Sequence, residues 1–231
     1  MPKVPPKAAL ANMVFRVLLC NWLIAVLAFG ASAAPADQPL RIVVLGDSLV
    51  AGFGIKHSEA FPAQLERALK ERGHAVEVIN AGVSGDTTAA GLDRVGWAVP
   101  ERTPAVILEL GGNDALRGLD PIRAKANLDK IITTLKAGGA EVLLAGMRAP
   151  RNMGERYTRA FDAIYPELAA KHGLILYPFF LDGVAMNGKL NLDDGIHPNS
   201  RGVAEITKNI LPSVEQLIER VRAKQAATTK G

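Results

Sequence analysis

A carboxylate and an imidazole lie close together near the carboxyl end of the chain, in Asp193-Asp194-Gly195-Ile196-His197-Pro198. A carboxylate that accepts a hydrogen bond from one ring nitrogen of a histidine orients the ring and leaves the other nitrogen free to act as a base. Such a base takes the proton of a serine hydroxyl during attack on an acyl carbonyl. Asp194 and His197 are therefore the candidate partners of a nucleophilic serine.

The candidate nucleophile is Ser48, in Gly46-Asp47-Ser48-Leu49. This segment follows an apolar run over residues 41–45, which is typical of a central strand, and the serine hydroxyl is expected at the carboxyl edge of a sheet. A second interpretation is that Asp47 and Ser48 only cap a helix, as both residue types often do. The segment alone leaves both interpretations open.

Two glycine-rich turns after the next predicted strands carry candidate donors for an oxyanion. They are Gly82-Val83-Ser84-Gly85-Asp86 and Gly111-Gly112-Asn113-Asp114. The backbone N–H of Gly85 can approach a ligand closely, and the carboxamide of Asn113 donates a hydrogen bond without adding charge. Ordinary turn chemistry also places glycine and asparagine after strands. Together with the candidate nucleophile and its base, however, the two turns predict a serine hydrolase site.

Five short apolar runs, each bounded by turn residues, predict the strands of a single sheet. Segments with helical spacing separate most of them, which indicates a parallel sheet in a three-layer α/β/α sandwich. Ligands bind outside the carboxyl ends of the strands in such folds, and the candidate residues follow the strands directly. The predicted strands are residues 41–45, 75–79, 105–110, 141–145 and 174–177.

The predicted helices occupy residues 87–102, about 122–135, 157–172 and a long final segment from Ser200. Ser200 is the expected N-cap of the last helix and Pro212 an expected kink, and residues 223–231 are expected to form an unstructured tail. A chain of 231 residues is long enough for one such domain, which we place at residues 34–222.

The first 33 residues have the order of a secretory signal peptide. Lys3, Lys7 and Arg16 precede an apolar run over residues 17–30, and small residues follow it at 31–33. A membrane-spanning helix is the alternative, but the run is shorter than the roughly 20 apolar residues that a bilayer core requires. We therefore expect export to the periplasm or the exterior, with cleavage after residue 33 and no stable membrane anchor.

The basic excess of the chain lies largely in this leader. The whole chain has 27 Lys and Arg against 23 Asp and Glu, and loss of the three basic residues of the leader leaves 24 against 23. With a net charge near +1, the mature chain has no electrostatic support for a nucleic-acid partner. The single cysteine, Cys20, also lies in the leader. No thiol is then available for catalysis, metal binding or a disulfide.

These segments resemble the blocks of the SGNH, or GDSL, hydrolase family over essentially the whole mature chain. The similarity is greatest to the periplasmic subgroup of arylesterases, acyl-CoA thioesterases and lysophospholipases, which also has segments like Met147-Arg148-Ala149-Pro150 and Tyr157-Thr158-Arg159-Ala160-Phe161. The G-x-S-x-G nucleophile elbow of α/β-hydrolases is absent around Ser48, because Val50 stands where its second glycine is required.

The resemblance implies a role for each matching residue. Ser48 is the nucleophile, His197 the general base and then acid, and Asp194 the residue that orients the imidazole. The oxyanion hole consists of the Ser48 and Gly85 backbone N–H groups and the Asn113 side chain. The resemblance further implies a five-stranded, flavodoxin-like sheet, no metal or other cofactor, and a mobile loop over residues 114–118.

The expected partner is a small ester or thioester, and we expect a monomer. Candidate substrate-binding residues are Asp47, Asp114, Leu116 and Met147, and further candidates for an apolar acyl groove are Met153, Ile164 and residues 179–181. Aryl esters, acyl thioesters, lysophospholipids and sugar acetates all suit the same catalytic residues. The sequence therefore leaves the leaving group and the acyl length open, and a carbohydrate O-acetylesterase is an alternative within the family.

Two alternatives lie outside esterase chemistry. In the first, Asp47, Asp114, Asp194 and His197 bind a divalent metal in a phosphoester hydrolase, because carboxylates with an imidazole suit such ions. In the second, the sheet edge is a non-catalytic binding site for a nucleotide or an acyl ligand. No G-x-G-x-x-G follows the first predicted strand, which disfavours a dinucleotide site.

Overall fold

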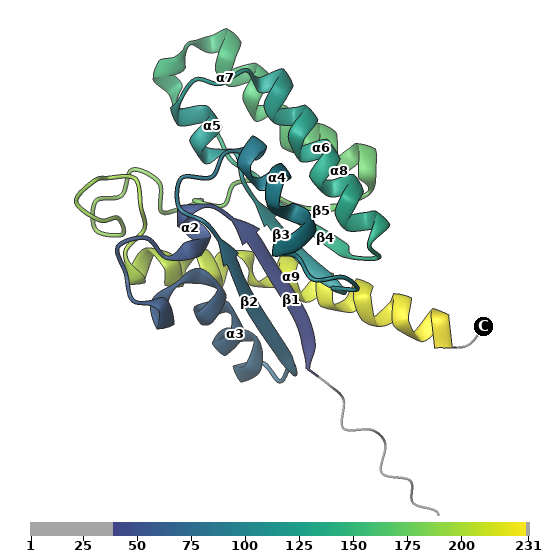
Figure 1. Cartoon of the computed structure of the whole chain (residues 1–231). Helices are drawn as coiled ribbons and strands as arrows, with labels where there is room; N and C mark the ends of the chain where they lie inside the picture. The colour runs from purple at the N-terminus through teal and green to yellow at the C-terminus, as the bar shows by residue number, and fades with distance from the viewer. Residues whose placement is uncertain (1–38, 230–231) are drawn as a thin grey trace, which may run out of the picture. The chain divides into compact units, whose positions relative to one another are not determined.

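A parallel five-stranded sheet forms the centre of the protein (Figure 1). A computed structural model describes residues 39–229, and the predicted signal peptide lies outside the described residues. The strand order is β2-β1-β3-β4-β5, the flavodoxin-like order, which confirms the predicted fold class. The strands are β1 (Leu40–Gly46), β2 (Val76–Gly82), β3 (Ala105–Glu109), β4 (Glu141–Ala145) and β5 (Ile175–Tyr177).

The central strands are apolar because helices cover the sheet on both sides. Residues 42–45 of β1 and 105–108 of β3 are fully buried, which is the pattern expected of strands with two covered faces. β1 pairs with β2 over its whole length and with β3 from Ile42 to Leu45. The carboxyl ends of β1, β2 and β3 therefore lie side by side.

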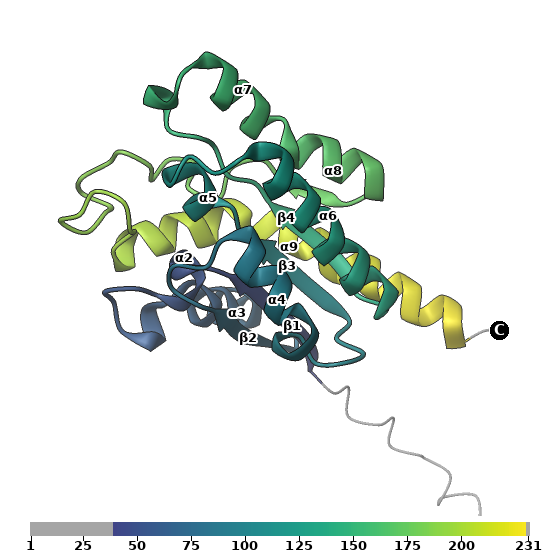
Figure 2. The same ribbon diagram turned by 45° about the horizontal axis from the view of Figure 1, so that its top comes forward.

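Two helical layers enclose the sheet (Figures 1 and 2). One contains α3 (Phe61–Glu71) and α9 (Ser200–Thr229), and the other contains α4 (Thr88–Ala98), α6 (Pro121–Ala137) and α8 (Ile164–His172). Short elements complete the chain: α2 (Ser48–Ala51), η1 (His57–Glu59), α5 (Gly112–Leu116), η2 (Arg151–Met153) and α7 (Glu155–Asp162). Between residues 39 and 229, no helix combines the length and apolarity needed to cross a membrane.

Some helix boundaries differ from those predicted. The segment 157–172 forms the two helices α7 and α8, separated at Ala163, instead of one. The last helix continues to Thr229, whereas the tail was expected to lose structure at residue 223. Its final turns are held in place by Lys224, which donates hydrogen bonds to the Gly139 carbonyl at 2.9 Å and the Glu141 carboxylate at 3.0 Å.

The first turn after β1 packs directly against the end of β2. A Cβ at Gly82 would lie 2.3 Å from the backbone nitrogen of Ala51 and 2.8 Å from the carbonyl carbon of Val50. Those atoms belong to α2, the short helix that begins at Ser48. The missing side chain of Gly82 therefore allows α2 to lie against the sheet edge.

We predict that Gly82→Ala destabilises the fold, because the clashing atoms are backbone and cannot move without displacing α2. The expected loss is about 1–3 kcal/mol of unfolding free energy, measured by urea denaturation. Gly96→Ala is the matched control, since Gly96 is an exposed residue inside α4 with no atom near the added methyl group. That substitution should stabilise the protein by about 0.5–1 kcal/mol. Equal effects of the two substitutions would contradict the proposed close approach.

Candidate active site

Ser48 lies at the start of α2, directly beyond the carboxyl end of β1. Its hydroxyl oxygen is 2.9 Å from Nε2 of His197, although the two residues are 149 positions apart in the chain. Asp47 caps the same helix, because its Oδ1 accepts a hydrogen bond from the backbone N–H of Leu49 at 3.0 Å. The capping interpretation thus describes the Asp47 side chain, while the neighbouring hydroxyl faces an imidazole.

Asp194 and His197 form a self-contained turn before α9. One carboxylate oxygen of Asp194 accepts the backbone N–H groups of Ile196 and His197 at 2.9 and 3.0 Å, and the other lies 2.6 Å from Nδ1 of His197. Asn199, rather than the expected Ser200, caps α9, because its side-chain oxygen accepts the N–H groups of Arg201 and Gly202. The turn is thereby fixed to the helix that follows.

The hydrogen bonds of this turn lower the pKa of Asp194 to about 2. The largest cause is the backbone N–H of His197, followed by its ring and the backbone N–H of Ile196. Asp194 is therefore ionised throughout the pH range in which a histidine titrates. An ionised acceptor at Nδ1 places the proton of a neutral imidazole on that nitrogen and leaves Nε2 as an acceptor for the Ser48 hydroxyl.

An aromatic ring that the sequence did not indicate covers the imidazole. The rings of Phe53 and His197 have centroids 4.4 Å apart and are tilted by 36°. Phe53 lies just after α2 and remains 50% exposed. Its contact restricts ring rotation and shields one face of the base from water. Nothing in the local sequence distinguishes it from an ordinary surface aromatic residue.

The candidate oxyanion donors lie on adjoining turns. Among the residues that the structure describes, none accepts a hydrogen bond from the backbone N–H of Ser48 or Gly85. The amide nitrogen of Asn113, in contrast, is 3.1 Å from Oδ2 of Asp47 and 3.0 Å from the carbonyl oxygen of Asp86. A substrate oxyanion must therefore replace one of these two acceptors to bind the Asn113 amide.

A buried ion pair holds the Gly85 turn against β1. Nε of Arg94 is 2.6 Å from the Asp86 carboxylate, and another guanidinium nitrogen donates to the carbonyl of Gly46 at 2.8 Å. Both side chains are buried. Arg117 donates to the Gly85 carbonyl from the solvent side at 3.0 Å. Arg94 was not among the predicted residues, although a charged residue on the apolar face of a predicted helix is a usable signal.

Two expected substrate-binding residues have structural roles. Asp47 and Asp114 are each only 2% exposed, so neither presents a carboxylate to solvent. The Asp114 carboxylate accepts the hydroxyl and the backbone N–H of Thr88 at 2.6 and 2.8 Å, and so holds the start of α4. Protein groups already occupy both carboxylates in the free protein, and a role in contacting substrate stays a prediction.

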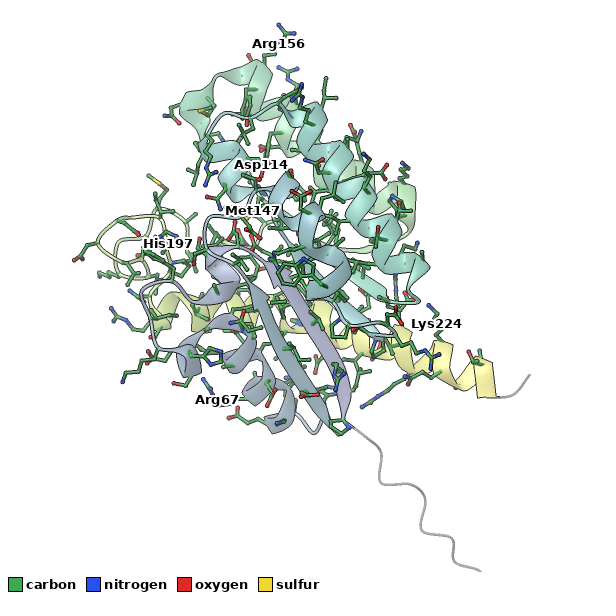
Figure 3. All side chains as sticks on the ribbon, in the orientation of Figure 1. Arg67, Asp114, Met147, Arg156, His197 and Lys224 are labelled. Atoms are coloured by element: carbon green, nitrogen blue, oxygen red, sulfur yellow. The ribbon has the colours of Figure 1, made fainter. Side chains whose placement is uncertain are left out.

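The expected apolar residues divide into surface and core. Leu116 on α5 is 52% exposed, whereas Met147 is 6% exposed and packs towards Gly112. Figure 3 shows Met147, Asp114 and His197 towards the carboxyl end of the sheet. Ile164 and Phe180 belong to the hydrophobic core and cannot line an open groove. Leu116 is thus the most exposed of the expected groove residues, while Met153, Phe179 and Leu181 are half-buried.

The alternative of a divalent-metal site has no suitable ligand cluster. Within residues 39–229, no group of three or more His, Cys, Asp or Glu side chains has an arrangement suited to a metal ion. The carboxylates of Asp114 and Asp194 each bind a nearby protein donor instead. The arrangement that the structure does present is a serine, an imidazole and a carboxylate in series.

A model of the GDSL-like Lipase/Acylhydrolase family matches residues 44–205. The chain belongs to this family. It is 39% identical to the esterase TesA of Pseudomonas aeruginosa over 178 residues, which cover 77% of this chain and 89% of that protein. It is 41% identical to thioesterase 1/protease 1/lysophospholipase L1 of Escherichia coli K12 over 189 residues, or 81% and 87% of the two chains.

The fold of this GDSL-like acylhydrolase also matches solved structures. The crystal structure of TesA superposes with a TM-score of 0.73 at 38% identity, covering 77% of this chain and 99% of that one. The family resemblance drawn from the sequence blocks is therefore confirmed, and with it the expectation of an acyl hydrolase.

We predict that Phe53→Ala lowers kcat of ester hydrolysis, because the imidazole loses its ring contact. A contact of about 0.5–1.5 kcal/mol corresponds to roughly 2- to 10-fold in rate, measured with p-nitrophenyl esters. Trp97→Ala is the matched control, since Trp97 is another exposed aromatic residue, near the end of α4 remote from Ser48. An increase in KM with unchanged kcat would show instead that Phe53 acts only in substrate binding.

Proposed function

We propose that the protein is a serine esterase and thioesterase that forms an acyl-enzyme on Ser48. The proposal rests on one observation: Ser48 Oγ lies 2.9 Å from His197 Nε2, and His197 Nδ1 lies 2.6 Å from the Asp194 carboxylate. These distances are those required for proton transfer from a nucleophile to an oriented base.

In the acylation step, Ser48 Oγ attacks the acyl carbonyl carbon while its proton passes to Nε2 of His197. The ionised Asp194 stabilises the imidazolium that forms. Collapse of the tetrahedral intermediate breaks the bond to the leaving alcohol or thiol, which receives the proton from Nε2. Water then attacks the acyl-enzyme by the same route, the acid is released and Ser48 regains its proton.

The negative charge of the tetrahedral intermediate requires donors on the opposite side of the carbonyl. The backbone N–H groups of Ser48 and Gly85 have no acceptor within the described part of the chain, which supports their assignment to the oxyanion hole. Asn113 joins them when its amide exchanges the neutral carbonyl of Asp86 for the oxyanion. The carboxylate of Asp47 is the stronger acceptor and keeps the other N–H.

Exposed apolar side chains on the surrounding loops favour acyl groups longer than acetate. Phe53, Val83, Leu116 and Ile196 are between 43% and 52% exposed, and each lies on a segment that carries a candidate catalytic or oxyanion residue. Apolar surface of this kind contributes to binding in proportion to the area that an acyl chain covers. A p-nitrophenyl ester series from acetate to palmitate tests this, and a preference for acetate would contradict it.

Residues 1–33 are proposed to direct export, and the mature enzyme then begins at Ala34 and acts in the periplasm or outside the cell. Amino-terminal sequencing of the protein from a periplasmic fraction is expected to give Ala34 as the first residue. Recovery of an intact chain from the cytoplasm alone would contradict export.

We predict that Ser48→Ala lowers kcat/KM on p-nitrophenyl esters by about 10⁴-fold or more, because the acyl-enzyme cannot form. Asn113→Ala should lower turnover by on the order of 10²-fold through loss of one oxyanion donor. Ser58→Ala, at an exposed serine of η1, is the control and should retain wild-type activity. A phosphonate inhibitor should label Ser48. Labelling of any other residue, or full activity of Ser48→Ala, would overturn the proposal.

A further inference from the structure

Glu109 is a buried acid that the reaction outlined above does not use. It is the last residue of β3, is fully buried, and lies beside the end of β1. Its Oε2 is 3.4 Å from the backbone nitrogen of Asp47, and would be 2.8 Å from a Cβ at Gly46. The absence of a side chain at Gly46 therefore makes room for this carboxyl group behind the turn that carries Ser48.

Among residues 39–229, no lysine or arginine forms an ion pair with the carboxyl group of Glu109 or of Asp47. The two carboxyl groups are adjacent, and a hydrogen bond between them requires a proton on one of them. Arg94, which reaches the Gly46 carbonyl beside Asp47, forms its ion pair with Asp86. The other titratable groups that face the pair are Asp86 and His197 beside Asp47, and Tyr165 beside both carboxyl groups.

Two adjacent buried carboxyl groups cannot both be ionised at low cost. Burial, and then the charge of Asp47, raise the pKa of Glu109 well above its usual value, while burial raises the pKa of Asp47 to about 6. Burial and mutual repulsion therefore favour a single proton on the pair, held by the more deeply buried Glu109. Oε1 of Glu109 is buried and accepts no hydrogen bond in the described structure.

Asp47 connects this acid to both sides of the site. One of its oxygens accepts the Leu49 N–H and so fixes the first turn of α2, where Ser48 lies. The other accepts the amide of Asn113 at 3.1 Å. Any rotation of the Asp47 carboxylate therefore disturbs the nucleophile and an oxyanion donor together.

We propose that Glu109 is a positioning residue: it remains protonated and donates a hydrogen bond to the Asp47 carboxylate, which then holds the Ser48 turn and the Asn113 amide. The inference rests on the proposed esterase function. A neutral Glu109 also leaves a single negative charge behind the oxyanion hole. An ionised Glu109 would add a second one and oppose the charge that develops on the substrate.

Two substitutions at Glu109 separate this role from simple core packing. Glu109→Gln retains a donor of the same size without a proton to lose, and should retain most of kcat. Glu109→Leu removes the donor, and kcat should decrease by about 10- to 100-fold with a much smaller change in KM. In the pH profile of kcat, the acid limb should also move to higher pH in Glu109→Leu. The Asp47 carboxylate loses a stabilising hydrogen bond in this variant, and its pKa therefore increases.

Matched variants exclude general destabilisation as the cause. Thr207→Val removes a buried, unpartnered hydroxyl from α9 and should leave kcat and its pH profile unchanged. In an Asp47→Asn background, Glu109→Leu should cause little further loss, because the two groups act through one contact. A folded Glu109→Leu variant with wild-type kcat and pH profile would overturn the proposal, as would a Glu109→Gln variant that is equally impaired.

An infrared difference spectrum between the wild-type protein and Glu109→Gln tests the protonation state directly, even if Glu109→Leu does not fold. At neutral pH we expect the carbonyl band of a protonated carboxylic acid in the wild-type protein only. A carboxylate band in its place would overturn the proposal. These outcomes are independent of the Ser48→Ala test, since loss of activity in Ser48→Ala with unaltered Glu109 variants would reject the positioning role alone.

Discussion

A parallel sheet brings the carboxyl ends of its strands to one edge, and the positions of Ser48, Gly85 and Asn113 depend on that arrangement. β1, β2 and β3 end side by side, and each is followed by a turn that contributes one group. The turns are close enough for their polar groups to satisfy one another: Asn113 bonds to Asp47, and Arg94 connects Asp86 to Gly46. Because the edge is largely buried, these bonds are necessary for stability as well as for geometry.

The fold and the catalytic candidates were largely predictable because their signals are local. Apolar runs mark strands covered on both faces, and Asp194 lies within one turn of His197. Ser48 and His197 are in contact although they are 149 positions apart in the chain. The expectation that they meet rested on the location of ligand sites at the carboxyl ends of parallel strands and on the family resemblance. Phe53, Arg94 and Glu109 escaped prediction because their partners are set by tertiary packing. The order of residues 223–229 was missed for the same reason, since the partners of Lys224 are 83 and 85 positions away.

The carboxylates of Asp47 and Asp114 are buried, and this burial has a common physical consequence. A carboxylate beside a catalytic motif suggests contact with substrate, but a buried carboxylate must first satisfy its own acceptor positions. Asp114 does so with Thr88, and Asp47 does so with Leu49 and Asn113. Sequence reveals the residue type but not the exposure, and exposure decides between the two roles. Asp47 also shows that the capping interpretation of this segment does not exclude a separate role for the neighbouring Ser48, because Asp47 caps α2 while the Ser48 hydroxyl faces His197.

The hydrogen bonds of Asn113 in the free protein bear on how the site would accelerate the reaction. Its amide already has two acceptors, so a neutral substrate carbonyl gains little by replacing the carbonyl of Asp86. The exchange becomes favourable as negative charge develops on the substrate oxygen, because charge-assisted hydrogen bonds are roughly twice as strong as neutral ones. An interaction that strengthens only towards the transition state lowers the barrier without tightening substrate binding. A saturated Asn113 is therefore compatible with catalysis and predicts that its contribution lies in kcat.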